Sequence, residues 1–444
     1  MLLVGNGKLF TRDRENPFVE DGCVAIQGQR ILKTGKTAEL RETYRNADFI
    51  DARGGLIMPG FINVHHHAYS AFARGLSIPG NNPSNFTQIL EGTWWKLDRA
   101  LSHEAVKYSG LVTFIECIRR GVTTVFDHHA SYGSTKGSLF SLDEAAVSLG
   151  LRACLCYEVS DRDGEDRMKE AVAENLTYIE ALKKRGPGLT AAMMGLHASF
   201  TLSDETLSYI QERLPRGTGF HIHVAEDFSD VRLTLAKHGK RVVHRLYDSG
   251  VLGPKTLAAH CIHLSPGEMA LLKETDTMAV YNPQSNMGNA VGCPPVLKLL
   301  EQGVLMGLGT DGYTSDMIES YKTGVILQRH HLGDPSVGFN EITRMLFENN
   351  RQIAGRIFNE PLGQLRPGAP ADVIVADYRP YTPLNEANLD GHIQFGMNGS
   401  LVHTVIVDGQ VVMKDNEIKT LDEKEVLSHA KEASQKLWSS LGAM

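Results

Sequence analysis

The stretch Met58-Pro59-Gly60-Phe61-Ile62-Asn63-Val64-His65-His66-His67 joins an apolar run to three consecutive histidines. Side chains alternate along a β-strand, so His65 and His67 point to one side and His66 points to the other. Two imidazoles on one side of a strand can share a metal ion, although a histidine-rich turn also occurs on ordinary surfaces. The stretch therefore predicts a strand with two metal ligands at its end, and further ligands must come from elsewhere in the chain.

From residue 56 onward, the chain repeats an apolar strand, a polar loop and an amphipathic helix. Eight such units over about 300 residues are typical of a closed (β/α)₈ barrel of the TIM type, an α/β fold. An open doubly wound sheet is the alternative, but no Gly-x-Gly-x-x-Gly follows an early strand to support it. The eight strand candidates end near His65, Asp127, Glu158, His197, His223, His260, Asn282 and Asp311.

Both ends of the chain show short strands and tight turns instead. Residues 23–26 and 30–33 flank a turn, and Asp408-Gly409 separates two further apolar runs, so each end contains a hairpin pattern. We expect both ends to form one small β-sandwich domain beside the barrel. The predicted divisions are residues 1–57 and 365–444 for the β-sandwich, the latter with a terminal helix, and residues 58–364 for the barrel. Helices are predicted at residues 37–44, 102–120, 165–185, 203–214, 230–249 and 421–441.

The composition is that of an ordinary enzyme, with 42% apolar and 22% charged residues among 444. The net charge of −7 argues against a nucleic-acid or anionic-membrane partner. No signal peptide or membrane span follows the first residues. The six cysteines form no Cys-x-x-Cys pair, which favours a reducing compartment. We therefore expect a cytoplasmic protein.

The predicted strand ends carry several metal-binding side chains. Barrel enzymes place their catalytic residues at these ends, and ionisable groups gathered there are costly unless they are paired or bind a metal. Among these side chains, His65, His67 and His223 offer nitrogen and Asp311 offers oxygen. This donor set suits one Zn²⁺ with an open coordination position, and Fe²⁺ or Mn²⁺ are alternatives. A second ion is not expected, because residues 189–196 contain no lysine that could bridge two metals. The predicted ligands are His65, His67, His223 and Asp311.

Three side chains near these ligands suit proton transfer and charge stabilisation. Asp311 lies between Gly309 and Gly312 and can accept the proton of a metal-bound water as well as bind the ion. Glu226 follows His223 closely and can carry a proton to a ring nitrogen of a substrate. His260 can hydrogen-bond the attacking hydroxide and the oxyanion that it becomes.

Short segments over nearly the whole chain carry a family resemblance: Pro59-Gly60-Phe61, His65-His66-His67, His197-Ala198-Ser199, His221-Ile222-His223-Val224-Ala225-Glu226, Ala259-His260-Cys261, Gly309-Thr310-Asp311-Gly312 and Gly368-Ala369-Pro370-Ala371-Asp372-Val373. Together they resemble the amidohydrolase superfamily, in its mononuclear deaminase-type branch. Within that branch the chain is similar to the SsnA-type aminohydrolases, relatives of guanine deaminase and of chlorotriazine hydrolases. The resemblance implies the same metal ligands, makes Glu226 and His260 catalytic, and gives His197 a contact with the substrate.

Three further substrate contacts are expected. Residues 88–97 resemble the part that closes over the ring in related deaminases, which makes Gln88 and Trp94 candidates. An aromatic side chain there can stack on a planar heterocycle, or it can equally belong to the core. His129 lies in Asp127-His128-His129, histidines that many relatives lack, and is either a substrate contact or a polar residue of the rim.

These observations predict a metal-dependent hydrolase of C–N bonds in purine metabolism. The expected reaction is hydrolytic deamination of a planar, purine-like nitrogen heterocycle by a metal-bound hydroxide. Two alternatives stay open: ring-opening hydrolysis of a cyclic amide or amidine in a purine-derived ring, and a non-catalytic maturation or regulatory protein of selenium or purine metabolism. By analogy with relatives, we expect a homo-oligomer, most simply a dimer, with a small molecule as its other partner.

Overall fold

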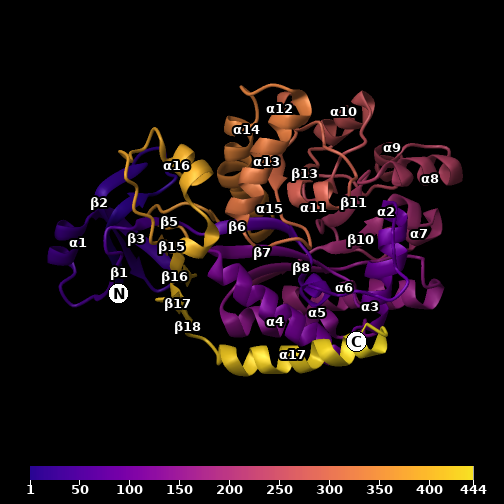
Figure 1. Ribbon diagram of the computed structural model, residues 1–444, viewed down its shortest axis with the longest axis horizontal. Coiled ribbons are helices and arrows are strands. Elements are labelled where there is room, and N and C mark those ends of the chain that lie inside the picture. The colour runs from indigo at the N-terminus through magenta and orange to yellow at the C-terminus, as the bar shows by residue number, and fades with distance from the viewer. Residues whose placement is uncertain (444) are drawn as a thin grey trace.

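The computed structural model describes residues 1–443 and has an α/β body beside a sheet built from both ends of the chain. Figure 1 shows this sheet at the left and the strands and helices of the body to its right. The predicted α/β class is confirmed. Within residues 1–443, no helix combines the length and the apolar character needed to cross a membrane.

The body is built on a four-stranded parallel sheet, β6-β7-β8-β9, and a five-stranded parallel sheet, β10-β11-β12-β13-β14. Only Met193 separates β9 from β10, so the predicted fourth strand passes from one sheet into the other. At the sheet edges, one isolated bridge pairs His66 with Asp311 and another pairs Val159 with Leu196. These bridges bring the two sheets into contact, and complete closure into a barrel stays a prediction. The strands are β6 (Phe61–His66), β7 (Val122–His129), β8 (Arg152–Tyr157), β9 (Thr190–Ala192), β10 (Met194–Ala198), β11 (Phe220–Val224), β12 (Leu257–His260), β13 (Met278–Tyr281) and β14 (Met306–Leu308).

Helices alternate with these strands, and every residue of β7 and β8 is buried, as expected for parallel strands covered on both faces. The helix predicted over residues 230–249 is two helices, because Gly239 adopts a left-handed φ of 68° and ends the first of them. The predicted helix ranges do not include α5, α10, α13 or α15. The longer helices are α4 (His103–Arg119), α5 (Ser138–Leu149), α6 (Glu165–Arg185), α7 (Asp204–Gln211), α8 (Phe228–His238), α10 (Pro266–Glu274), α13 (Met317–Leu332) and α15 (Asn350–Phe358). The short helical segments are η1 (Ala68–Ala73), α2 (Phe86–Ile89), η2 (Leu90–Trp94), α3 (Trp95–Ala100), η3 (Ser199–Thr201), α9 (Val242–Asp248), α11 (Pro283–Gly288), α12 (Val296–Glu301), α14 (Phe339–Arg344) and η4 (Met345–Asn349).

The two ends of the chain share one nine-stranded sheet of order β18-β17-β16-β15-β5-β1-β2-β3, with β4 paired to β1. The C-terminal half joins the N-terminal half where β15 pairs antiparallel with β5. The stretch that leads to His65 begins in this sheet and then enters the body as β6. A two-layered sandwich and the predicted domain boundaries stay predictions. The elements are β1 (Leu2–Phe10), β2 (Phe18–Gln27), β3 (Arg30–Lys36), α1 (Thr37–Thr43), β4 (Asp48–Asp51), β5 (Leu56–Pro59), β15 (Val373–Ala376), α16 (Leu389–Gly396), η5 (Gly399–Leu401), β16 (Val402–Val407), β17 (Gln410–Lys414) and β18 (Glu417–Ile418).

The terminal helix, α17 (Glu423–Ser440), leaves this sheet and lies along α4 of the body (Figure 1). Its Glu423 accepts hydrogen bonds from Arg119 at the end of α4. Near the other end of α17, the indole Nε1 of Trp438 donates to the carbonyl of Phe72 in η1 at 2.7 Å. The helix is therefore attached to the segment that directly follows His67.

Candidate metal centre and active site

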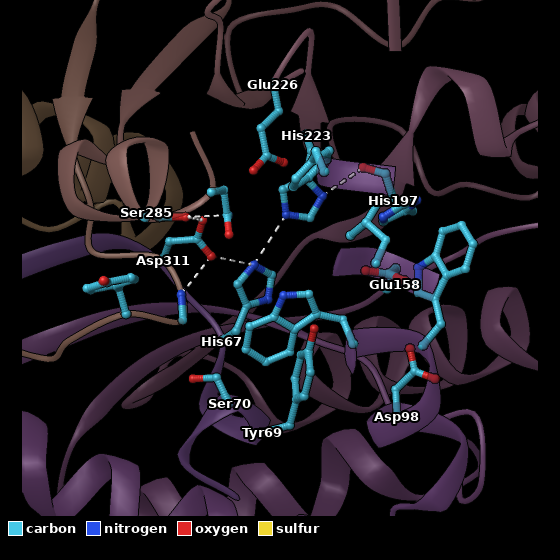
Figure 2. Close-up of a pocket in the computed structure, with 18 residues that line it drawn as sticks. His67, Tyr69, Ser70, Asp98, Glu158, His197, His223, Glu226, Ser285 and Asp311 are labelled. Carbon is cyan, nitrogen blue, oxygen red and sulfur yellow. Dashed lines mark hydrogen bonds and ion pairs between the residues drawn. The ribbon is translucent and has the colours of Figure 1, made fainter. Parts of the chain in front are cut away.

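Three histidines and one aspartate converge at the carboxyl ends of the strands, and Figure 2 shows His67, His223 and Asp311 of this group. His65 and His67 come from the end of β6, and His223 comes from β11. The Nε2 atoms of His67 and His223 are 3.3 Å apart. The Oδ1 atom of Asp311 lies 3.1 Å from Nε2 of His67 and 3.8 Å from Nε2 of His65. The structure thus brings together all four predicted ligands.

The hydrogen bonds at the Nδ1 atoms of these histidines indicate that their Nε2 atoms are free to bind a cation. Nδ1 of His67 lies 2.6 Å from the carbonyl oxygen of His128, and Nδ1 of His223 lies 2.8 Å from that of His197. A carbonyl only accepts, so each neutral ring carries its proton on Nδ1 and presents a lone pair at Nε2. Nε2 of His65 is buried without a hydrogen-bond partner among residues 1–443. Lone pairs that face one another at this distance repel unless a cation lies between them, and three nitrogens with one carboxylate suit Zn²⁺.

Asp311 is held in place by its backbone and by two hydrogen bonds. It follows β14 with a left-handed φ of 56°, and its side chain accepts from Ser285 Oγ and from the Gly312 amide, both at 2.6 Å. A Cβ at Gly309 would lie 2.9 Å from Cβ of His65, so only glycine lets these two segments approach.

Glu226 and His260 lie beside the ligand cluster. Oε2 of Glu226 is 3.5 Å from Nε2 of His260, and that nitrogen is also 3.5 Å from Oδ2 of Asp311. Burial and the nearby carboxylates, Asp311 first among them, raise the pKa of Glu226 well above its ordinary value, which favours the protonated acid. Ala225 and His260 have left-handed φ values of 47° and 73°. Strained backbone of this kind, as at Asp311, clusters at functional sites.

A pocket of about 770 Å³, open space at its mouth included, lies above these residues. Its floor contains His67, His223 and Asp311. Its aromatic side chains are Tyr69, Phe86, Trp94, Trp95 and Tyr313. The pocket therefore offers flat apolar surfaces close to the ligand cluster, as a planar heterocycle requires.

The predicted substrate contacts divide into two groups. His197 and Trp94 line the pocket. Gln88 does not: it is exposed on the outer face of α2, and its Oε1 accepts from the Ser84 amide at 2.8 Å. His129 is wholly buried outside the pocket lining, with Nε2 2.9 Å from Ser131 Oγ. Both predictions are corrected, because helix and strand periodicity turn these two side chains away from the cavity.

Other lining residues were not predicted as site residues. Glu158 was recognised only as the end of a strand, and Asp98, Tyr69 and Tyr313 carried no motif. Asp98 follows the Trp94-Trp95 pair by one helical turn, which was the only signal in the sequence. Asp98 and Tyr69 lie on the short helical segments α3 and η1, and Glu158 and Tyr313 lie on loops after strands, so no long periodic pattern pointed to them.

Comparison with known proteins places this geometry in a family. The model for the amidohydrolase family matches residues 56–412. The 5'-deoxyadenosine deaminase of Methanosarcina mazei is 32% identical, with 98% of each chain covered. The 5-methylthioadenosine/S-adenosylhomocysteine deaminase of Pelotomaculum thermopropionicum is 30% identical, again with 98% of each chain covered. Among solved structures, a zinc-bound adenosine deaminase from Xanthomonas campestris superposes with a TM-score of 0.86 at 20% identity, covering 99% of this chain and 98% of that one. Guanine deaminase of E. coli has a TM-score of 0.78 at 20% identity, covering 94% and 100%.

Proposed function

Because this chain belongs to the amidohydrolase family, we propose that it hydrolytically removes the amino group of a purine-like heterocycle of the adenosine type. The predicted class of enzyme, a hydrolase of carbon–nitrogen bonds, is confirmed, since the similar proteins are named as deaminases. The observation that carries the proposal is the convergence of three imidazole nitrogens and Asp311 at an aromatic-walled pocket, in which His67, His223 and Asp311 line the floor.

His65, His67, His223 and Asp311 would hold one divalent ion, with Zn²⁺ as the best match to this donor set. When bound, such an ion lowers the pKa of water to about 7 and so supplies a nucleophile at neutral pH. Fe²⁺ and Mn²⁺ are accommodated by the same donors.

The chain's own residues handle the protons and orient the ring. Asp311 accepts the proton of the attacking water, and Glu226, whose pKa is raised by burial, donates a proton to the ring nitrogen. His260 lies between these two carboxyl groups and stabilises the charge that develops on the oxygen. Proton return to the amino group then releases ammonia and leaves a carbonyl on the ring. Trp94 and Tyr69, whose rings meet edge to face at 6.1 Å, hold the plane of the ring.

We also infer that the two parallel sheets close into a (β/α)₈ barrel, supported by the edge bridges and by the unbroken passage from β9 to β10. Barrel closure explains why side chains from β6, β11 and the loop after β14 meet in one place. A cytoplasmic location and a homodimer stay predictions.

Purified, metal-loaded protein tests the proposal against adenosine, 5'-deoxyadenosine, 5'-methylthioadenosine and guanine. Ammonia release with conversion of the amino group to a carbonyl is expected for at least one of them. A new carboxylate without ammonia would instead establish ring opening. Absence of any reaction, with the ion bound, would favour the non-catalytic alternative, against which the complete set of Glu226, His260 and Asp311 argues.

A further inference from the structure

The helical segment that follows β13 lies between the strands that carry His260 and Asp311. In the five-stranded sheet, β13 is flanked by β12, which ends at His260, and by β14, which precedes Asp311. The segment comprises α11 and its C-cap residue Asn289, whose amide donates to the carbonyl of Ser285 at 2.8 Å. We call residues 283–289 the α11 segment. It stands at the same edge of the sheet as the two groups of the candidate site.

Ser285 of the α11 segment holds one oxygen of Asp311 (Figure 2). Its Oγ donates to Oδ2 at 2.6 Å, whereas Oδ1 accepts from the Gly312 amide, also at 2.6 Å. Oδ1 is the oxygen that faces His67, at 3.1 Å, and Oδ2 lies 3.5 Å from Nε2 of His260. The two oxygens of one carboxylate are thus held toward different groups, and a carboxylate that could turn would lose this division.

Asn286, the next residue of the α11 segment, holds the ring of His260. Its Oδ1 lies 2.8 Å from Nδ1 of that ring, and both side chains are wholly buried. An amide oxygen only accepts, so Nδ1 donates to it. The bond fixes the plane of the ring, with Nε2 lying 3.5 Å from Oε2 of Glu226 and 3.5 Å from Oδ2 of Asp311.

Asn289 adds a contact with the third proton-transfer group. Burial raises the pKa of Glu226, whereas a hydrogen bond with Asn289 acts in the opposite direction. Nδ2 of Asn289 also donates to Oγ of Ser285 at 3.3 Å. The α11 segment therefore contacts all three side chains to which the proposed reaction gives a proton or a developing charge.

We propose that Ser285 and Asn286 are positioning residues for the proton-transfer steps. Ser285 orients the carboxylate that accepts the water proton, and Asn286 orients the imidazole that stabilises the developing charge. This inference rests on the proposed deamination. A misplacement of about 1 Å at a reacting group can cost about 100-fold in rate, so such orientation matters to the reaction. The two residues act on different groups, since Asp311 is also a proposed metal ligand and His260 is not.

Asn286→Leu removes the hydrogen bond to His260 and leaves a side chain of similar size. It should lower kcat by about 10- to 100-fold on a compound that the unaltered protein deaminates, with KM within about threefold. Competition with a chelator in the absence of substrate measures Zn²⁺ affinity. In this variant the affinity should stay within about threefold, because no proposed ligand has lost its support.

Ser285→Ala should lower both quantities. Its hydroxyl supports a proposed ligand, so Zn²⁺ affinity and kcat should each fall by about 10- to 100-fold. Ser285→Thr keeps the hydroxyl and should retain most of the affinity and of the rate. A mere loosening of the helix would not separate affinity from rate in one variant and lower both in the other.

Gln284→Leu is the matched control, because it also replaces an amide by leucine on the same helix. Oε1 of Gln284 has no hydrogen-bond partner among residues 1–443, and Gln284 does not line the pocket. Its kcat, KM and Zn²⁺ affinity should stay within about threefold of those of the unaltered protein. Urea unfolding of each variant shows that the fold is retained. If Asn286→Leu does not fold, the comparison of Ser285→Ala with Ser285→Thr still tests the role of the hydroxyl.

Each contrary outcome has its own meaning. Ammonia release with kcat unchanged in Asn286→Leu and Ser285→Ala would overturn the positioning role and leave the deaminase intact. Equal losses in Gln284→Leu and Asn286→Leu would overturn it too, because the effect would then be that of a disturbed helix. A kcat in Ser285→Thr as low as in Ser285→Ala would remove the hydroxyl from the proposal. If the unaltered protein releases no ammonia from any of the tested compounds, the proposed function itself fails, and this inference fails with it.

Discussion

Nδ1 of His65 lies 2.8 Å from Nε2 of His221, so one buried imidazole holds another in the wall of the site. The other two proposed histidine ligands, His67 and His223, are held by main-chain carbonyls, which substitution cannot remove. His221 stands two residues before His223 on β11, so one strand provides both a ligand and the support of a second ligand. If Nε2 of His65 binds the ion, the ring carries its proton on Nδ1 and donates it to Nε2 of His221.

His221→Leu should therefore weaken metal binding by about 10- to 100-fold, the usual effect of losing such a support. His221→Gln should retain most of the affinity, because its Oε1 can accept near the position of Nε2. His221→Asn is the control, since its shorter amide is polar but cannot reach that position. Competition with a chelator measures the affinities. Equal losses in the Gln and Asn variants would show that ring packing, not hydrogen bonding, matters at this position.

Glu226→Gln should lower kcat by about 10²- to 10⁴-fold while the metal stays bound. The amide keeps the shape of the acid but cannot donate a proton and regain it. Elemental analysis measures the metal content, and kcat is measured on the same preparation with a compound that the unaltered protein deaminates. Near-normal turnover would rule out Glu226 as the proton donor.

The protein should contain about one divalent ion per chain, and Asp311→Asn should reduce both its occupancy and the rate. This variant loses a charged ligand and the acceptor of the water proton together. Elemental analysis before and after dialysis against a chelator measures occupancy, and re-addition of Zn²⁺ should restore activity only in the unaltered protein. Two tightly bound ions per chain would contradict a mononuclear site.

Trp438→Phe should destabilise the protein by about 1 kcal/mol, because the carbonyl of Phe72 loses its hydrogen bond. Trp438→Ala should cost more, since it also removes packing against the segment that carries Tyr69. Urea unfolding measures both changes. Leu427→Ala on the same helix is the control: Leu427 is 50% exposed and its loss should have little effect.

Asp143 should contribute pH-dependent stability by joining α5, α6 and β9. It accepts hydrogen bonds from Arg185, Thr190 and Tyr178. Burial raises the pKa of Asp143, but these bonds outweigh it and lower the pKa below 3.8. A lowered folded pKa means that the stabilisation is present above about pH 4 and is lost as the pH falls through the folded pKa.

Asp143→Asn should thus cost about 1 kcal/mol at pH 7, a modest value because Arg185 is half-exposed. The difference from the unaltered protein should shrink as the pH falls below 4. Urea unfolding at several pH values measures it. A difference that stays constant down to pH 3 would show that the carboxylate charge does not matter there.

Much of the candidate site could be read from the sequence because its proposed ligands stand at the ends of strands. Strand alternation placed His65 and His67 on one side, and an apolar run ending in a polar residue marked each of the other ends. The separation of α8 from α9 was missed, although Gly239 was a visible signal, because the apolar pattern continues across it. Gln88 and His129 were misplaced because a resemblance indicates a segment and does not tell which face of it meets the cavity.

The sequence by itself determined the order of the body's strands, the joining of the two chain ends by similar β patterns, and the residues that form the candidate ligand cluster. These follow from local periodicity and from side-chain chemistry, which short segments contain in full. Only the tertiary structure set Ser285 beside Asp311 and His221 behind His65. Those contacts join residues of separate elements, and their distances depend on how the whole body packs, so no local pattern records them.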